Sequence, residues 1–135
     1  MTATPTILYV EDDLESREIM RVLVEEVMQL PGLVLFGDST DFLLRVEALQ
    51  PRPDIILLDI HVAPHNGFQM LDMLRDHRYY KHVPIVALTA SVMNEEVQML
   101  QDAGFDGAIA KPLDQTVFPQ LLERILNGED IWSIV

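Results

Sequence analysis

Apolar residues along the chain follow two alternating patterns. Short unbroken apolar runs, bounded by proline, glycine or charged residues, predict strands that are buried on both faces of a parallel sheet. Between these runs, apolar residues recur every three or four positions, which predicts helices with one buried face. The predicted strands are residues 7–10, 33–36, 55–59, 85–90 and 107–110.

Five helices are predicted between and after these strands. The third begins near Gly67, and Gly104 and Gly128 end the fourth and fifth, since glycine commonly follows the last turn of a helix. The residues predicted to face inward are, in chain order, Ile19, Val22, Leu23, Val27 and Met28; Phe42, Leu43, Val46 and Leu49; Phe68, Leu71 and Leu74; Val97, Leu100 and Ala103; and Val117, Phe118, Leu121, Leu122, Ile125 and Leu126.

Polar residues mark where some helices begin. Asp13 is predicted to cap the first helix, because its carboxylate can accept hydrogen bonds from backbone N–H groups of the first turn. Ser39 or Thr40 is predicted to cap the second helix, and Ser91 or Asn94 the fourth.

Strands and helices in alternation predict an α/β fold. Five strand–helix pairs require a doubly wound, five-stranded parallel sheet with right-handed crossovers and helices on both faces. The simplest arrangement is flavodoxin-like, with strand order 2-1-3-4-5. A chain of 135 residues fits one domain, here residues 1–128. Residues 129–135, EDIWSIV, form an apolar C-terminal tail outside this pattern.

Two interpretations of the tail remain open. Its apolar side chains are Ile131, Trp132, Ile134 and Val135, and exposing them to water is unfavourable. In one interpretation the tail folds back on its own domain or is a disordered remnant of a linker. In the other it docks on a second subunit or a partner and, together with the fifth helix, forms a self-complementary homodimer.

Charge and composition exclude several classes of protein. The formal net charge is -13 and the pI is near 4.4, so direct binding to nucleic acid is not expected. No apolar run is long enough to cross a bilayer, and the first residues lack the basic flank of a signal peptide. We therefore expect a soluble, cytoplasmic protein without membrane contact. With no cysteine, the chain has neither a disulfide nor a thiolate metal site.

Candidate chemistry is concentrated at the carboxyl ends of four predicted strands. Glu11 and Asp12 follow the first strand, Asp59 ends the third, Thr89 lies at the end of the fourth, and Lys111 follows the fifth. Because these strands are neighbours in the predicted order, their ends meet in one crevice. Clustered carboxylates repel one another without a cation, and their oxygens suit Mg²⁺. A lysine and a hydroxyl suit a phosphoryl group held beside that ion.

The motifs VEDD, LLD, LTA and AKP, in this order and at these spacings, resemble a response-regulator receiver domain of two-component signalling. The resemblance covers residues 5–127 and implies that Asp59 is the phosphoacceptor, with Thr89 and Lys111 contacting the phosphoryl oxygens. The donor would be the histidine of a sensor histidine kinase or of a phosphotransfer protein. The output would be interaction with a downstream protein target, so the resemblance implies a phosphorylation-switched signalling domain rather than an enzyme.

The resemblance also implies a metal site. Asp12 would bind Mg²⁺ directly and Glu11 partly through water, alongside Asp59 and the backbone carbonyl of His61. The imidazole of His61 is not implied as a ligand. Mn²⁺ can substitute for Mg²⁺ in such a site.

Two positions depart from the family's pattern. Most receivers have a proline four residues after the phosphoacceptor, whereas Pro64 is the fifth residue after Asp59, although Gly67 keeps the usual eighth position. The loop after Asp59 is therefore expected to follow a different path. Three residues before Lys111, where the family usually has tyrosine or phenylalanine, this chain has Ala108. Alanine cannot make the usual aromatic switch, which puts the usual route of output in doubt.

Three other readings are weaker or stay as alternatives. A phosphatase of the haloacid dehalogenase type needs a second aspartate two residues after the first, where this chain has His61. A flavin-binding flavodoxin needs a phosphate loop after the first strand, and the acidic EDDLES would repel phosphate. A receiver-like interaction module that works without phosphorylation remains the alternative function.

Overall fold

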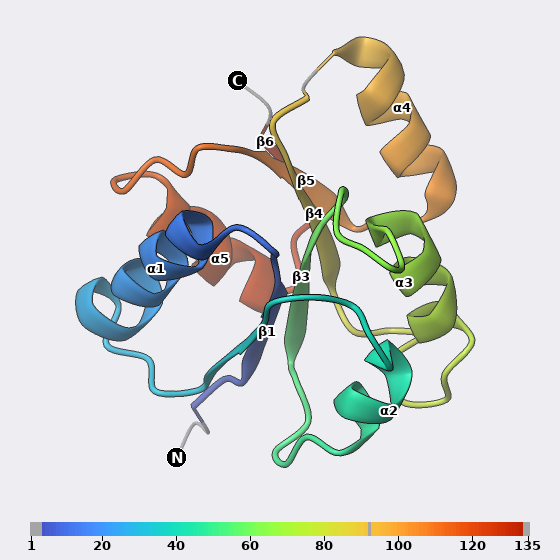
Figure 1. The fold of residues 1–135 in the computed structure, drawn as a ribbon. Coiled ribbons are helices and arrows are strands. Elements are labelled where there is room, and N and C mark those ends of the chain that lie inside the picture. Colours follow the sequence, from blue (N-terminus) through green and yellow to red (C-terminus); the bar gives the residue numbers. More distant parts are fainter. Residues whose placement is uncertain (1–3, 92, 134–135) are drawn as a thin grey trace.

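Six parallel strands form one sheet in the order β2-β1-β3-β4-β5-β6 (Figure 1). The structure, a computed structural model, describes residues 4–91 and 93–133. The strand order predicted for the first five strands is confirmed, and the sixth strand was not predicted. The strands are β1 Ile7–Val10, β2 Leu33–Phe36, β3 Ile55–Asp59, β4 Ile85–Thr89, β5 Gly107–Ala110 and β6 Ile131–Ser133.

Helices cover both faces of the sheet, as predicted (Figure 1). One face carries α1 Leu14–Arg21, its continuation η1 Val22–Val27, and α5 Phe118–Leu126. The other carries α2 Phe42–Glu47, α3 Gly67–Arg75 and α4 Asn94–Ala103. This makes the flavodoxin-like, three-layered arrangement that five strand–helix pairs require.

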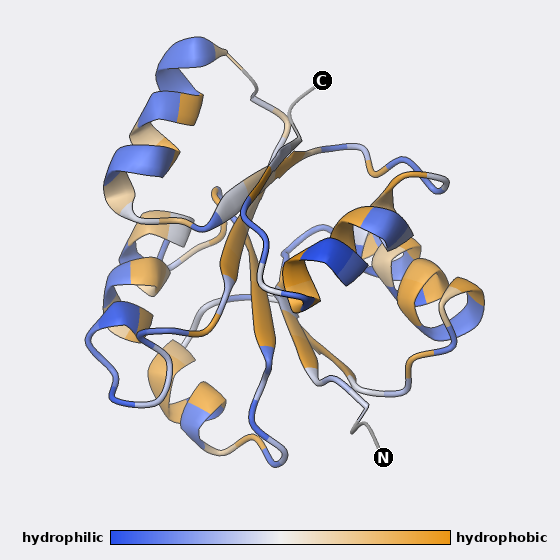
Figure 2. Ribbon diagram, turned by 180° about the vertical axis from the view of Figure 1, so that it is seen from behind, coloured by the Kyte–Doolittle hydropathy of each residue, from blue (hydrophilic) through white to orange (hydrophobic). Residues whose placement is uncertain are grey.

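The central strands have an apolar core on each side. In β1, Ile7 and Tyr9 belong to the core beneath α1 and α5, whereas Leu8 and Val10 belong to the core beneath α2 and α3. Successive side chains of a strand point to opposite faces, so an unbroken apolar run fills both cores. Figure 2 shows the resulting hydrophobic strands at the centre of the molecule.

The start of the first helix agrees with the prediction, and two other starts do not. The Asp13 carboxylate accepts a hydrogen bond of 2.9 Å from the backbone N–H of Ser16, as a helix cap does. The N-cap residues of α2 and α4 are instead Asp41 and Met93, and neither makes a side-chain capping bond. The predicted cap Ser39 is wrong because its hydroxyl is used elsewhere, in the loop beside the candidate site.

Some residues predicted to face inward are exposed. The chain from Val22 to Val27 is π-helical, which turns Val22 and Val27 to the surface and buries Met20 and Val24 instead. Ala103 is exposed in the last turn of α4, and Val117 is the exposed N-cap of α5. Spacing alone misplaced these four residues, because it assumes an uninterrupted α-helix and leaves the helix ends undetermined.

The C-terminal segment completes the sheet. Ile131 lies opposite Gly107 and is buried in the core beneath α5, while Trp132 lies opposite Ala108 and packs against the other core. A Cβ at position 107 would overlap the carbonyl oxygen of Ile131, so glycine there makes room for β6. Residues 131–133 therefore fold back on their own domain, as the first interpretation of the tail expects. Ile134 and Val135 lie outside the described residues, and the homodimer stays a prediction.

In the described part of the chain, no helix is both long enough and apolar enough to span a bilayer.

Candidate functional site

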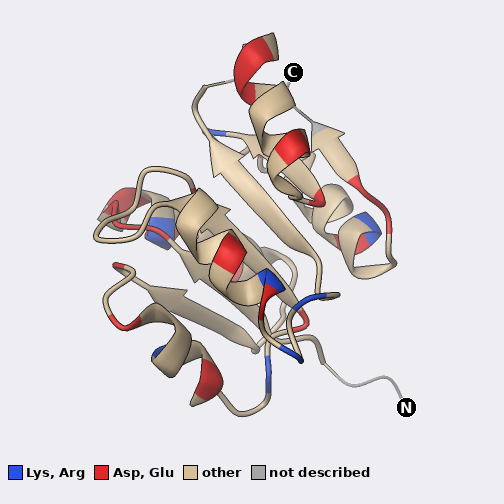
Figure 3. Cartoon of the chain, turned by 90° about the vertical axis from the view of Figure 1, so that its right-hand side faces the viewer, with Lys and Arg blue, Asp and Glu red and all other residues tan. Residues whose placement is uncertain are grey.

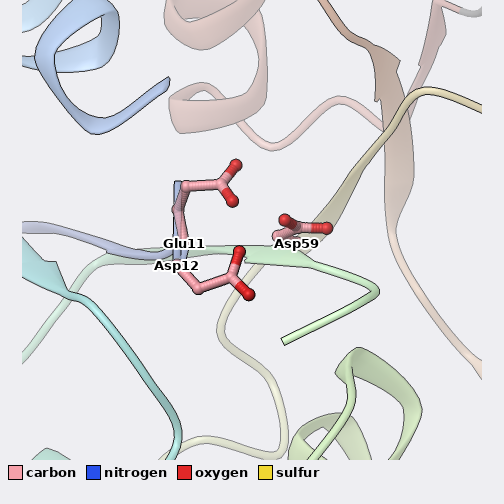
Figure 4. Close-up of side chains that lie close together, drawn as sticks. All are labelled: Glu11, Asp12 and Asp59. Carbon is pink, nitrogen blue, oxygen red and sulfur yellow. The ribbon is translucent and has the colours of Figure 1, made fainter. Parts of the chain in front are cut away.

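Three carboxylates meet at the carboxyl edge of the sheet. The register of β1 and β3 pairs Val10 with Leu58, so Glu11, which follows β1, and Asp59, which ends β3, lie side by side. Glu11, Asp12 and Asp59 each offer an oxygen atom, and these atoms lie within 4.8 Å of one another (Figure 4). Glu11 is fully buried and Asp59 is only 6% exposed, whereas Asp12 is exposed. The predicted convergence of these three residues is observed.

Lys111 lies against the same cluster. It follows β5, and its Nζ atom lies 2.6 Å from Oε1 of Glu11 and 3.3 Å from Oδ2 of Asp59. Both contacts are ion pairs in a largely buried setting, where the screening of charge by water is weak. Lys111 thus balances part of the negative charge.

Hydrogen bonds from neighbouring residues fix Glu11. The hydroxyl of Tyr9 donates to Oε1 at 2.6 Å, and the backbone N–H of Asp13 donates to Oε2 at 3.2 Å. The guanidinium of Arg17 donates to the backbone carbonyl of Glu11 at 2.8 Å. We did not assign Tyr9 or Arg17 to the site from the sequence. The two-residue spacing of Tyr9 and Glu11, which puts both on one side of a strand, was the available signal for Tyr9.

The pKa values of the two buried carboxyl groups are shifted in opposite directions from their ordinary values. Burial raises the pKa of Asp59 to about 6, and its contact with Glu11 adds to the rise, whereas the His61 N–H and Lys111 oppose it. Burial alone would raise the pKa of Glu11, but hydrogen bonds with Asp59, Lys111 and Tyr9 outweigh it and lower the pKa. Ionising Asp59 beside an ionised Glu11 is therefore costly without a further cation.

The pKa of Lys111 is also displaced from its ordinary value. Burial would lower this pKa, but the hydrogen bond to Glu11 and the charge of Asp59 raise it. Lys111 therefore stays cationic at neutral pH and remains a fixed positive charge beside Asp59.

Thr89 lies at the same edge but does not bond to the carboxylates in this structure. It ends β4 and is buried, and its Oγ1 atom accepts a hydrogen bond of 3.0 Å from the backbone N–H of Ser91. A longer contact of 3.4 Å runs from Oγ1 to the carbonyl oxygen of Ser91. The hydroxyl is thus engaged with the first residues after its own strand.

The loop that follows Asp59 is held by two contacts. The backbone N–H of His61 donates to Oδ1 of Asp59 at 3.1 Å, which orients that carboxylate. Farther along, Ser39 Oγ donates to the carbonyl oxygen of His65 and accepts from its N–H, both at 2.7 Å. The buried Ser39 therefore ties the loop after β2 to the loop after β3, which explains why it does not cap α2.

Gly67 brings the start of α3 against the end of β3. A Cβ at this position would lie 2.7 Å from Cδ1 of Ile60 and 2.9 Å from its Cα. The N–H of Gly67 donates to the carbonyl oxygen of Ile60 at 3.0 Å. This close approach joins the two ends of the loop after β3, although Pro64 in that loop is one residue later than in most receivers.

The chemistry of the donors fits a hard divalent cation. All three groups are carboxylates, and Mg²⁺ is typically bound in proteins through one or two carboxylates together with other oxygen ligands. Mutual repulsion between the buried groups would be relieved by such an ion. A buried carboxylate, a fixed cation and further carboxylates that could hold a metal share one edge, and this arrangement suits the transfer of a phosphoryl group.

Comparison with known proteins agrees with this geometry. Residues 7–125 match the response regulator receiver domain family. The chain is 25% identical over 124 residues to the polar-differentiation response regulator DivK of Brucella ovis, covering 92% of this chain and 98% of DivK. It is 27% identical over 131 residues to the signal transduction histidine-protein kinase BarA of Shigella flexneri, covering 96% of this chain and 14% of BarA.

A solved structure shows the same fold. It is the receiver domain of the sensor histidine kinase PA1611 of Pseudomonas aeruginosa, which has a magnesium ion coordinated in its active-site cleft. The two folds superpose with a TM-score of 0.80 at 24% sequence identity, over 93% of this chain and all of the other. With a family match over most of its length and this fold, the chain belongs to the response regulator receiver domain family of two-component signalling.

Proposed function

We propose that Asp59 accepts a phosphoryl group, in a reaction that depends on Mg²⁺, from the histidine of a sensor histidine kinase or a phosphotransfer protein. The observation that carries this proposal is the buried Asp59 carboxylate, placed beside the acidic pair and 3.3 Å from Lys111. A phosphorylation site gives each of these groups a use.

The transfer needs no separate general base. An ionised oxygen of Asp59 attacks phosphorus in line, the Oδ–P bond forms, and the P–N bond to the donor imidazole breaks with its electron pair leaving on nitrogen. Lys111 stabilises the negative charge on the oxygens that do not react. Thr89 exchanges its bond with Ser91 for a phosphoryl oxygen.

The same residues would hold the metal. Glu11, Asp12, Asp59 and the backbone carbonyl of His61 are the proposed ligands of Mg²⁺, for which Mn²⁺ can substitute. The ion, when bound, supplies positive charge that offsets the carboxylates and the phosphoryl oxygens. The magnesium ion in the PA1611 receiver domain supports this assignment.

The partners follow from the reaction. Similarity to a segment of the histidine-protein kinase BarA and to the receiver domain of the sensor histidine kinase PA1611 supports a phosphohistidine donor. We propose that the phosphorylated domain then signals by binding a downstream protein target. Its acidic net charge of -13 argues against direct contact with nucleic acid.

Phosphorylation with a small-molecule donor tests the proposal without knowing the kinase. With acetyl phosphate and Mg²⁺, the parent protein should give a phosphoprotein band that Asp59→Asn lacks. Asp76→Asn, which makes the same change at an exposed position after α3, should label like the parent. A labelled Asp59→Asn protein would refute the assignment. A parent that never labels would favour the alternative, an interaction module that works without phosphorylation.

A further inference from the structure

A cavity of about 160 Å³ lies between α3, α4 and the loop after β3. Its walls are mostly apolar and include Ile60, Phe68, Met99 and Leu100. The ring of Phe68 is held by an edge contact with Phe105, with ring centroids 5.8 Å apart. The apolar walls of this cavity take no part in the phosphoryl transfer described above.

One acidic side chain lines this cavity without a partner. Oε2 of Glu96 is buried and has no hydrogen-bond partner among the described residues. Leaving a buried carboxylate oxygen unsatisfied costs free energy, because the oxygen has lost water and gained no donor. A ligand that supplies a donor there would recover that cost.

The residues around Glu96 indicate which kind of hydrogen-bond donor would fit the cavity. A carboxylate only accepts hydrogen bonds, so the ligand must donate, and the apolar walls call for an aliphatic stem behind the donor. Arginine and lysine side chains combine a cationic head that only donates with such a stem. The helix α4 carries Glu95, Glu96 and Asp102 and no Lys or Arg, so the approach of a cation is favoured (Figure 3).

We propose that this cavity receives the side chain of an arginine or lysine from a partner protein, with the cationic head paired to Glu96. The cavity is also lined by His61 and Thr89, so the partner's side chain would lie against residues that flank the phosphoacceptor. A partner docked through this contact would be next to the site that changes on phosphorylation.

Two small probes separate charge recognition from apolar binding. Butylguanidinium copies the end of an arginine side chain, and n-butanol has the same stem without the charge. Titration of the parent protein, followed by the methyl NMR signals of methionine, should shift Met99 most. We expect n-butanol to bind about tenfold more weakly than butylguanidinium, since a charge-assisted pair is lost.

Variants with a matched control test the assigned carboxylate. Glu96→Gln should weaken butylguanidinium about tenfold, while Glu95→Gln, the same change at an exposed residue of the same turn, should alter it less than about twofold. Equal affinity of the parent for both probes would overturn the proposal. So would equal losses in the two variants, or a largest shift at a methionine other than Met99. The comparison of the two probes uses the parent protein alone, so it remains a valid test even if a variant fails to fold.

Discussion

At the scale of single residues, ionisation of Asp59 should oppose folding when no metal is bound. The pKa of Asp59 is raised in the folded protein, so its protonated form stabilises the fold. This contribution to the free energy of unfolding is complete below the pKa of the unfolded chain and is lost as pH rises through about 6. The lowered pKa of Glu11 acts in the other direction and at lower pH, where protonation would remove its contribution. Asp59 therefore dominates the pH dependence of stability in the window between its ordinary pKa of 3.8 and its folded pKa of about 6.

Asp59→Asn should consequently stabilise the metal-free protein above this window. At about pH 7.5 with a chelator, the gain in the free energy of unfolding should be at most about 3 kcal/mol, the equivalent of two pKa units. At about pH 5 roughly half of the difference should remain, because Asp59 is then largely protonated in the folded parent but still ionised in its unfolded chain. Urea unfolding of both proteins at the two pH values measures this. A variant that is less stable than the parent at both would contradict the assigned burial cost.

Tyr9 offers a second test at this scale, since its hydroxyl holds the buried Glu11. Tyr9→Phe removes one oxygen atom and should lower Mg²⁺ affinity about tenfold, as losses of supporting hydrogen bonds around metal ligands do. Tyr80→Phe is the matched control, because Tyr80 is also buried and lies outside the site. Isothermal titration with Mg²⁺ gives both affinities. Equal affinities for the two variants would mean that the Tyr9 bond does not position Glu11.

At the scale of elements, the strands were predictable and several helix ends were not. Unbroken apolar runs such as residues 55–58 are typical of strands buried on both faces, and no local interaction competes with that signal. The start of a helix depends on whether a nearby polar side chain caps it or forms a hydrogen bond with another part of the protein. Ser39 bonds the distant His65 rather than the start of α2, and sequence spacing holds no information about that contact.

The strand β6 escaped prediction because three residues are too few to show a period. Its place depends on Gly107, whose neighbour Ile131 leaves no room for a Cβ. Gly107→Ala should displace β6 and lower the free energy of unfolding by about 1.5–3 kcal/mol, the value of burying one aliphatic side chain such as Ile131.

Trp132 is the single tryptophan of the chain, so its fluorescence reports on β6 directly. Emission of the Gly107→Ala protein should shift to longer wavelength as the indole becomes exposed to water. Gly37→Ala is the control, because the nearest atoms that a Cβ there would meet belong to the side chain of Arg17, at 3.3 Å and beyond. An unchanged emission maximum in Gly107→Ala would show that β6 does not depend on this close approach.

At the scale of the whole molecule, the candidate site could be predicted because it depends on topology. Residues from four separate strands meet at one edge, as the strand order required, and the position of Asp12, Asp59 and Lys111 follows from that order alone. The strand order left undetermined which of these groups form hydrogen bonds with one another. Thr89 bonds Ser91, and Tyr9 bonds Glu11, because local geometry decides such contacts.

Metal binding should stabilise the entire fold by linkage. Mg²⁺ that binds only the folded protein should raise the free energy of unfolding by about 2.7 kcal/mol at 100 times its dissociation constant. Asp12→Ala should remove most of this gain with little effect on the metal-free protein, because Asp12 is exposed. Thermal unfolding with and without Mg²⁺ measures both. Equal responses in variant and parent would place the metal elsewhere.

The assignment of Asp59 as phosphoacceptor is tested most directly by trapping the phosphorylated residue. After reaction with acetyl phosphate and Mg²⁺, borohydride reduces an aspartyl phosphate to homoserine, which tandem mass spectrometry locates in the sequence. The account predicts homoserine at position 59, formed only when Mg²⁺ was present. Homoserine at another aspartate, or at none while the phosphoprotein accumulates, would contradict it.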